Sequence, residues 1–131
     1  MTASLDTNVL LRLALRDIPA QYEVARDLVV AQNSHFVVTD TAIAEVVHAL
    51  MHHYHFSRGQ VAAVIEAILA EPAITSNVRL ITATLNQFLS QPQLSYTDCY
   101  LAEEANLGHN IPLLTFDKDL AKHHPAAQLL D

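Results

Sequence analysis

Five acidic residues of this chain lie within or directly after apolar stretches, at positions where their carboxylates could do chemistry. Asp6 closes the stretch TASLD, and Asp117 follows IPLLTF, with Asp119 one lysine further on. Asp98 lies in SYTD and Glu45 in TAIAEVVHAL. Carboxylates can move protons or bind a hard divalent cation through their oxygens. We therefore ask whether the fold brings these acids together.

The elements that would position them alternate along the chain. Apolar and β-branched runs predict strands at TASLD, SHFVVT, AIT and IPLLTF, the last of them buried. Apolar spacing and capping signals, including SRGQ and SYTD, predict helices over residues 7–15, 20–32, 39–55, 57–70, 77–89 and 95–108. Pro19 should end the segment formed by the first strand and helix, and a short helix and strand should close the chain. This alternation predicts a single domain over residues 1–131, a three-layer α/β/α sandwich with a mostly parallel sheet.

A parallel sheet would bring the acids to one place. Ligands bind at the carboxyl ends of parallel strands, where the following helices begin. Asp6 and Asp117 end strands, while Asp98 and Glu45 lie near helix starts, so we expect all four at the same edge. Four like charges this close require protons or a cation. The sequence therefore favours a site for Mg²⁺ or Mn²⁺, which prefer oxygen ligands and can activate a bound water.

Each acid also has a purely structural interpretation. Asp6 and Asp117 could cap the helices that follow them, and Asp98 could complete a capping box with Ser95. Glu45 lies opposite the apolar stripe of its helix, as a solvent-exposed residue would. These interpretations remain open for each acid taken singly.

Composition limits the classes of function. The chain has 131 residues, with 14 Asp and Glu against 7 Lys and Arg, and a formal net charge of −7. This sign excludes nucleic-acid binding through a broad basic surface and is compatible with a basic protein partner. Cys99 is the one cysteine, so no internal disulfide is possible, and its likelier role is a small buried thiol. The stretch VLLRLAL is too short to span a bilayer, so we expect a cytoplasmic protein without a membrane partner.

The histidines of HALMHHYH offer a different chemistry. His48 and His52 are four residues apart on the helix that carries Glu45, and His53 and His55 follow. Such a pair can bind zinc, but the segment lacks the glutamate next to the first histidine that a zinc peptidase helix needs. We expect exposed or partner-facing histidines.

Several motifs together resemble a known family. LDTNVLLRL, TAIAEVVHAL, SRGQVAAVIEAIL and YTDCYLAEEANLGHNIPLLTFDKDL occur in the order and at the spacing of PIN-domain ribonucleases, and most closely resemble the VapC toxins of VapBC toxin-antitoxin systems. The resemblance covers nearly the whole chain. Cys99 is one departure, because the family more often has alanine there.

The resemblance implies an activity and a set of roles. It implies Mg²⁺- or Mn²⁺-dependent hydrolysis of RNA, leaving a 3′-hydroxyl and a 5′-phosphate, homodimers, and inhibition by a cognate VapB-type antitoxin. The family's metal ligands correspond here to Asp6, Glu45, Asp98 and Asp117. The same resemblance implies that Asn8 and Thr115 orient the site through hydrogen bonds. Asp119 could serve a second metal or be a surface charge. The cations nearest the expected site, which could contact phosphate or be solvated, are Lys118, Lys122 and Arg12.

Other classes of function compete with this interpretation. A haloacid-dehalogenase-type enzyme would also place an aspartate after its first strand, but it needs a second acid where this chain has Asn8. A PIN nuclease of RNA processing and a non-catalytic acidic module that binds a basic peptide both remain open. The sequence does not indicate which RNA would be cut, because RNA recognition depends on shape and unpaired bases.

Overall fold

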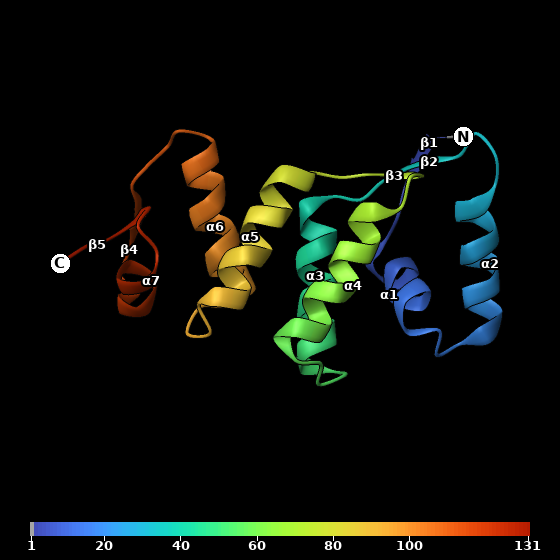
Figure 1. Ribbon diagram of the computed structural model, residues 1–131, viewed down its shortest axis with the longest axis horizontal. Coiled ribbons are helices and arrows are strands. Elements are labelled where there is room, and N and C mark those ends of the chain that lie inside the picture. The colour runs from blue at the N-terminus through green and yellow to red at the C-terminus, as the bar shows by residue number, and fades with distance from the viewer. Residues whose placement is uncertain (1) are drawn as a thin grey trace. The chain divides into compact units, whose positions relative to one another are not determined.

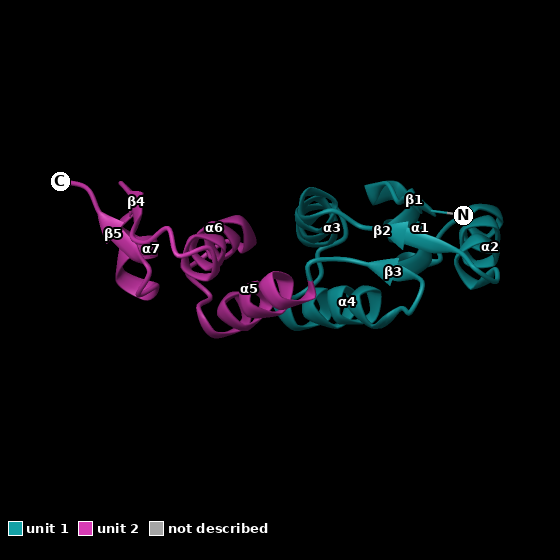
Figure 2. Cartoon of the chain, turned by 90° about the horizontal axis from the view of Figure 1, so that it is seen from above, with its two compact units in different colours: residues 1–77 teal, residues 78–131 magenta. Residues whose placement is uncertain are grey.

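A computed structural model describes residues 2–131 (Figure 1). Over that range it contains seven helices and five strands in a mixed α/β arrangement. In chain order these are β1 (Thr2–Ser4), α1 (Thr7–Leu15), α2 (Pro19–Val30), β2 (His35–Val37), α3 (Asp40–His52), α4 (Arg58–Ala70), β3 (Ile74–Thr75), α5 (Val78–Ser90), α6 (Tyr96–Leu107), β4 (Leu113–Thr115), α7 (Lys118–His123) and β5 (Ala127–Leu129). The chain divides into two compact units, residues 1–77 and 78–131, coloured separately in Figure 2.

Unit 1 is built on a three-stranded parallel sheet in the order β1-β2-β3. Ser4 pairs with Val37, and the Leu5 N–H donates to the Val37 carbonyl at 3.0 Å, so the ladder extends to the residue before Asp6. Helices α2, α3 and α4 lie around this sheet (Figure 2). The core is aliphatic with one aromatic ring, and its fully enclosed side chains include Leu10, Phe36, Val38, Ile43, Val46, Leu50, Val61 and Ile65.

Unit 2 has its own small parallel sheet, in which β4 pairs with β5. Helices α5 and α6 pack against each other. The rings of Phe88 and Tyr96 meet edge to face with centroids 5.9 Å apart, a favourable aromatic geometry. Cys99 is fully buried in α6, as expected for a small apolar side chain.

Local capping chemistry sets the helix starts. Ser57 and Gln60 form the predicted capping box: each side chain accepts from the other residue's backbone N–H, at 3.2 and 2.9 Å. Ser95 Oγ likewise accepts from the Asp98 N–H at 3.1 Å. Pro19 was expected to close the segment formed by the first strand and helix, and in the structure it is the first residue of α2. Its fixed φ suits the first helical turn, where the backbone needs no amide donor.

The expectation of a buried strand at IPLLTF is wrong. The strand forms, but it covers only Leu113–Thr115. Leu114 is 55% exposed and the following Phe116 is 80% exposed. A two-stranded sheet buries little of either face, so an apolar run can form a strand there without becoming core.

The fold class agrees with the sequence prediction. The mixed α/β structure has only parallel strand pairing among the described residues and is consistent with an α/β/α fold. That the whole chain forms a single domain remains a prediction, because the two units are each compact by themselves. Within residues 2–131, no helix combines the length and apolar character needed to cross a bilayer.

Candidate active site

Asp6 is positioned by the end of β1 and the start of α1. The Leu5 ladder hydrogen bond fixes the chain on one side, and the Val9 N–H donates to the Asp6 carbonyl at 3.1 Å on the other. Asp6 has the extended backbone of an N-cap, with φ −77° and ψ 157°, yet its side chain makes no capping hydrogen bond. The exposed carboxylate therefore remains available for a ligand.

Glu45 is brought to Asp6 by the neighbouring strand. Because β1 and β2 are paired and parallel, α1 and α3 both begin at the same edge of the sheet. Glu45 is exposed on α3, and its Oε2 accepts a hydrogen bond of 2.6 Å from the Thr7 hydroxyl, one residue after Asp6. The structure thus brings Asp6 and Glu45 into one neighbourhood of unit 1.

The other two predicted acids belong to unit 2. Asp98 is half-buried in the first turn of α6, where its backbone N–H is held by Ser95. Asp117 follows β4, and its Oδ1 accepts from the Leu120 N–H at 3.0 Å, so this carboxylate caps α7. Two of the four predicted acids therefore lie in each unit, and convergence of all four remains a prediction.

Thr115 fixes the backbone at Asp117. Its Oγ1 accepts from the Asp117 N–H at 2.9 Å, which closes a tight turn between β4 and α7. The orienting role that the sequence resemblance assigned to Thr115 remains a prediction.

The cations named from the sequence differ in availability. Lys118 and Lys122 are exposed on α7, which also carries the exposed Asp119 in its first turn. Arg12 is engaged within unit 1: its Nε lies 3.1 Å from Asp17 Oδ1, and its Nη2 donates to Tyr54 Oη at 3.2 Å. The lysines of α7 are therefore more available to a phosphate than Arg12 is.

Asn8 lies exposed in the first turn of α1, next to Thr7. It lines a shallow groove between α1 and α2 together with Val24 and Leu28, both at least partly exposed. The orienting role given to Asn8 by the sequence resemblance remains a prediction.

The carboxylate oxygens of the four predicted acids are suitable ligands for a hard divalent ion. The four acids offer only carboxylate oxygens, the ligands that Mg²⁺ and Mn²⁺ favour over nitrogen or sulfur. Asp6 keeps its carboxylate outside the helix cap, and Glu45 and Asp117 each commit one oxygen to a described hydrogen bond. Among residues 2–131, no three histidine, cysteine or acidic side chains already form a metal-binding group.

The histidines on α3 are exposed, as expected. The rings of His48 and His52 lie one turn apart with centroids separated by 4.4 Å. His53 follows the end of α3, and His55 adopts a left-handed backbone with φ 56°. No group of three or more potential metal ligands includes these histidines among residues 2–131.

A buried polar pair in unit 2 escaped the sequence analysis. His124 Nε2 lies 2.9 Å from Glu103 Oε1, and His124 Nδ1 accepts from the Ala126 N–H at 3.0 Å. Both side chains are buried, and because Nδ1 accepts from Ala126, Nε2 is the ring nitrogen that faces the Glu103 carboxylate. The pair ties α6 to the turn before β5. The two residues are 21 positions apart, and no periodic pattern marks either one.

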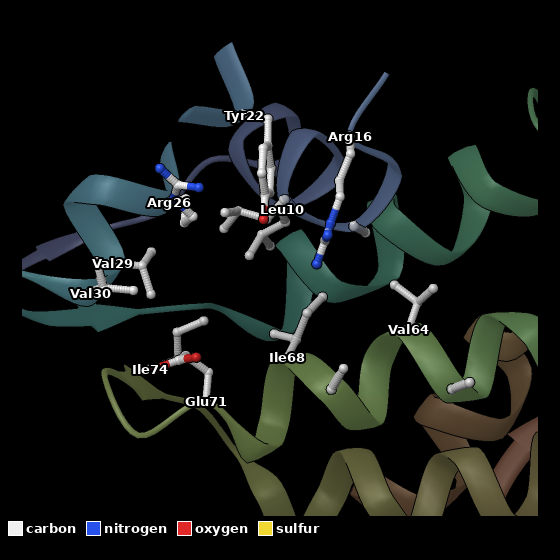
Figure 3. Close-up of a pocket in the computed structure, with 14 residues that line it drawn as sticks. Leu10, Arg16, Tyr22, Arg26, Val29, Val30, Val64, Ile68, Glu71 and Ile74 are labelled. Atoms are coloured by element: carbon white, nitrogen blue, oxygen red, sulfur yellow. The ribbon is translucent and has the colours of Figure 1, made fainter. Parts of the chain in front are cut away.

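Unit 1 also contains an apolar pocket of about 450 Å³ between α1, α2 and α4 (Figure 3). Aliphatic side chains such as Leu10, Val64 and Ile68 form most of its lining. Arg16 and Arg26 flank Tyr22, with guanidinium carbons 4.9 and 5.8 Å from the ring centroid. Neither Asp6 nor Glu45 lines it, so this pocket is distinct from the carboxylate neighbourhood.

Arg26 remains charged at the rim of this pocket. Asp27 Oδ1 accepts from Arg26 Nη2 at 3.1 Å, and this hydrogen bond, with the charge of Asp27, raises the pKa of the guanidinium above its ordinary value. The charge of Arg26 at the rim is therefore paired with that of Asp27, and Glu71 also lines the pocket.

Comparisons with known proteins identify a family for most of the chain. The PIN domain family model matches residues 3–124, through both compact units. No curated protein matches the chain. Among solved structures, one similar chain comes from a crystal structure of VapBC2 from Rickettsia felis bound to a DNA fragment from their promoter. It is 16% identical, with 99% of this chain and 98% of that chain covered and a TM-score of 0.42.

Proposed function

The chain belongs to the PIN domain family, and on that basis we propose that it is a divalent-metal-dependent endoribonuclease, the toxin of a VapBC-type toxin-antitoxin system. PIN domains are generally metal-dependent nucleases, and the RNA substrate and toxin role are the specific parts of the proposal. The observation that carries it is the pair Asp6 and Glu45. The Asp6 carboxylate is not used as a helix cap, and Glu45 is hydrogen-bonded to the next residue.

The proposed site uses carboxylates from both units. Asp6, Glu45, Asp98 and Asp117 would supply oxygen ligands to Mg²⁺ or Mn²⁺. The range matched by the family model, residues 3–124, includes all four acids. When bound, the ion lowers the pKa of a water and neutralises charge on the phosphate. Asp119 is a candidate ligand for a second ion.

Other residues of the chain would bind and orient the substrate. Lys118 and Lys122, both exposed on α7, are candidates to contact the phosphate groups. Thr115 holds the Asp117 backbone, which keeps that carboxylate at the end of β4. Arg12 would contribute its charge while remaining paired with Asp17. No side-chain nucleophile is needed, because the attacking group is water.

The partners follow from the same proposal. We place the protein in the cytoplasm, as a homodimer inhibited by a small VapB-type antitoxin. The aliphatic pocket of unit 1 supports a protein partner, since it offers apolar burial between two arginines, Arg16 and Arg26. An adjacent short reading frame with a basic, amphipathic C-terminal segment would distinguish the toxin from a PIN nuclease of RNA processing.

The test is RNA cleavage by the full chain purified free of antitoxin. We expect cleavage of a structured RNA with Mg²⁺ or Mn²⁺, its loss with a chelator, and a fall of more than about 100-fold in Asp6→Asn, because a metal ligand contributes more than the outer-shell groups whose loss costs 10–100-fold. Asp27→Asn, which changes an exposed acid on α2, is the matched control and should cleave normally.

Two outcomes would contradict the proposal. Intact cleavage by Asp6→Asn would remove Asp6 from the site. Absence of any metal-dependent cleavage, together with retained binding of a basic peptide by Asp6→Asn, would instead favour the non-catalytic acidic module.

A further inference from the structure

One hydrogen bond links the two acids of unit 1 across 38 residues of sequence. The Thr7 hydroxyl donates to Glu45 Oε2 at 2.6 Å. The hydroxyl is the donor, and the carboxylate oxygen is the acceptor. The distance lies within the 2.5–2.7 Å range of hydroxyl–carboxylate bonds, which are about twice as strong as bonds between neutral groups.

Thr7 presents its hydroxyl from a well-fixed backbone. It is the first residue of α1, between Asp6, whose carbonyl accepts from Val9 and Leu10, and the helix body. Its β-branched side chain has few rotamers. A second contact, Arg12 to Tyr54, joins α1 to the chain just after α3 at 3.2 Å, so two contacts hold these segments together.

The Glu45 side chain, unlike that of Thr7, is not restricted to a few rotamers by its own branching. It is an exposed, three-torsion side chain on the polar face of α3, where an unbonded glutamate would sample several rotamers. The bond to Thr7 selects one rotamer and uses Oε2. The described bond leaves Oε1 as the second oxygen of a carboxylate that is held beside the Asp6 position.

We propose that Thr7 is a positioning residue: its hydroxyl orients the Glu45 carboxylate next to Asp6 for binding a divalent ion. This inference rests on the proposed function. It assigns Thr7 no contact with the substrate or the reacting atoms. Its effect passes through Glu45, so it should change the affinity for metal more than the rate at saturating metal.

The experiment measures Mn²⁺ binding to the full chain by calorimetry, independently of activity. Thr7→Val removes the hydroxyl while keeping the branched shape, and Thr7→Ser keeps the hydroxyl. We expect Thr7→Val to raise the Kd for Mn²⁺ on the order of tenfold, in the range found when outer-shell partners of metal ligands are lost. Thr7→Ser should remain within about threefold of wild type, since it restores the donor.

Control variants distinguish a positioning role of Thr7 from a role that only stabilises the contact between α1 and α3. Thr82→Val changes an exposed threonine of α5 and should leave the Kd unchanged. Thr7→Val should give less than twofold additional loss when combined with Glu45→Gln, because the Thr7 effect requires the carboxylate. Cleavage assays should show a raised Mn²⁺ concentration for half-maximal rate and recovery of kcat at saturating Mn²⁺. If Thr7→Val does not fold, Thr7→Ala against Thr7→Ser gives the same comparison.

The results distinguish this inference from the proposed function. An unchanged Kd in Thr7→Val, or equal weakening by Thr7→Val and Thr7→Ser, overturns the positioning role even if Asp6→Asn abolishes binding. A wild-type chain that neither binds Mn²⁺ nor cleaves RNA overturns the proposed function and this inference with it.

Discussion

Asp6 in unit 1 and Asp117 in unit 2 occupy equivalent local positions but use their carboxylates differently. Each follows a strand and precedes a helix in an extended N-cap conformation, with φ near −80°. Asp117 Oδ1 accepts from the Leu120 N–H, whereas Asp6 makes no side-chain cap. The N-cap position therefore does not decide whether an aspartate is structural. A carboxylate has two oxygens, so Asp117 can cap with one and still offer the other to a ligand.

The two helices that follow these aspartates also differ in length. α7 has six residues and α1 has nine. A six-residue helix has few internal hydrogen bonds to offset the cost of ordering it, so a cap contributes a larger share of its stability. α1 is also tied to α3 and its C-terminal end by Thr7 and Arg12. It can therefore form without a cap from Asp6.

The largest expected effect tests whether Asp117 has the catalytic role in addition to the cap. Asp117→Asn should lower RNA cleavage by more than about 100-fold, as proposed for Asp6→Asn, because it removes a metal-binding charge. Its melting temperature should stay within about 2 °C of wild type, since asparagine caps as well as aspartate. Cleavage rates and thermal unfolding measured on one preparation check both halves. Near-normal cleavage would leave Asp117 with a capping role alone.

A smaller effect separates the two caps by stability. Asp117→Ala should lower the free energy of unfolding by about 1 kcal/mol, the usual cost of losing an N-cap side chain. Asp6→Ala should lower it by less than about 0.5 kcal/mol, because no capping bond is lost. Urea denaturation of the two variants gives the comparison, and equal losses would show that the cap at Asp6 forms in solution after all.

The smallest effect concerns the second acid of the FDKD segment. Asp119 is exposed in the first turn of α7. If Asp119 is a surface charge and not a ligand of a second ion, Asp119→Asn should change the cleavage rate by less than about threefold. A loss as large as that of Asp117→Asn would make Asp119 a ligand of equal importance.

The sequence predicted much of the local structure because local chemistry determines it. The capping box at Ser57 and Gln60 fixed the start of α4, and the apolar spacing of α3 matched its buried face. Asp6 was correctly placed after the first strand. These features depend on residues within one or two helical turns of each other, where periodicity is informative.

Contacts between distant segments could not be predicted in this way. A helical wheel shows Glu45 as a solvated side chain, and its partner Thr7 lies 38 residues earlier. His124 is buried against Glu103, which lies 21 residues earlier in the chain. Contacts of this kind depend on which segments of the chain become neighbours in the fold. The side chains that make them are of types that also occur commonly on protein surfaces, so the sequence does not single them out.

The most direct test of the central claim is Mn²⁺ binding by the full chain, measured for wild type, Asp6→Asn and Asp117→Asn. If carboxylates from both units share one ion, each single variant should raise the Kd of the tight site by more than about 100-fold. Wild-type affinity in either variant would contradict the account, because it would show that the ion is held by the acids of one unit alone.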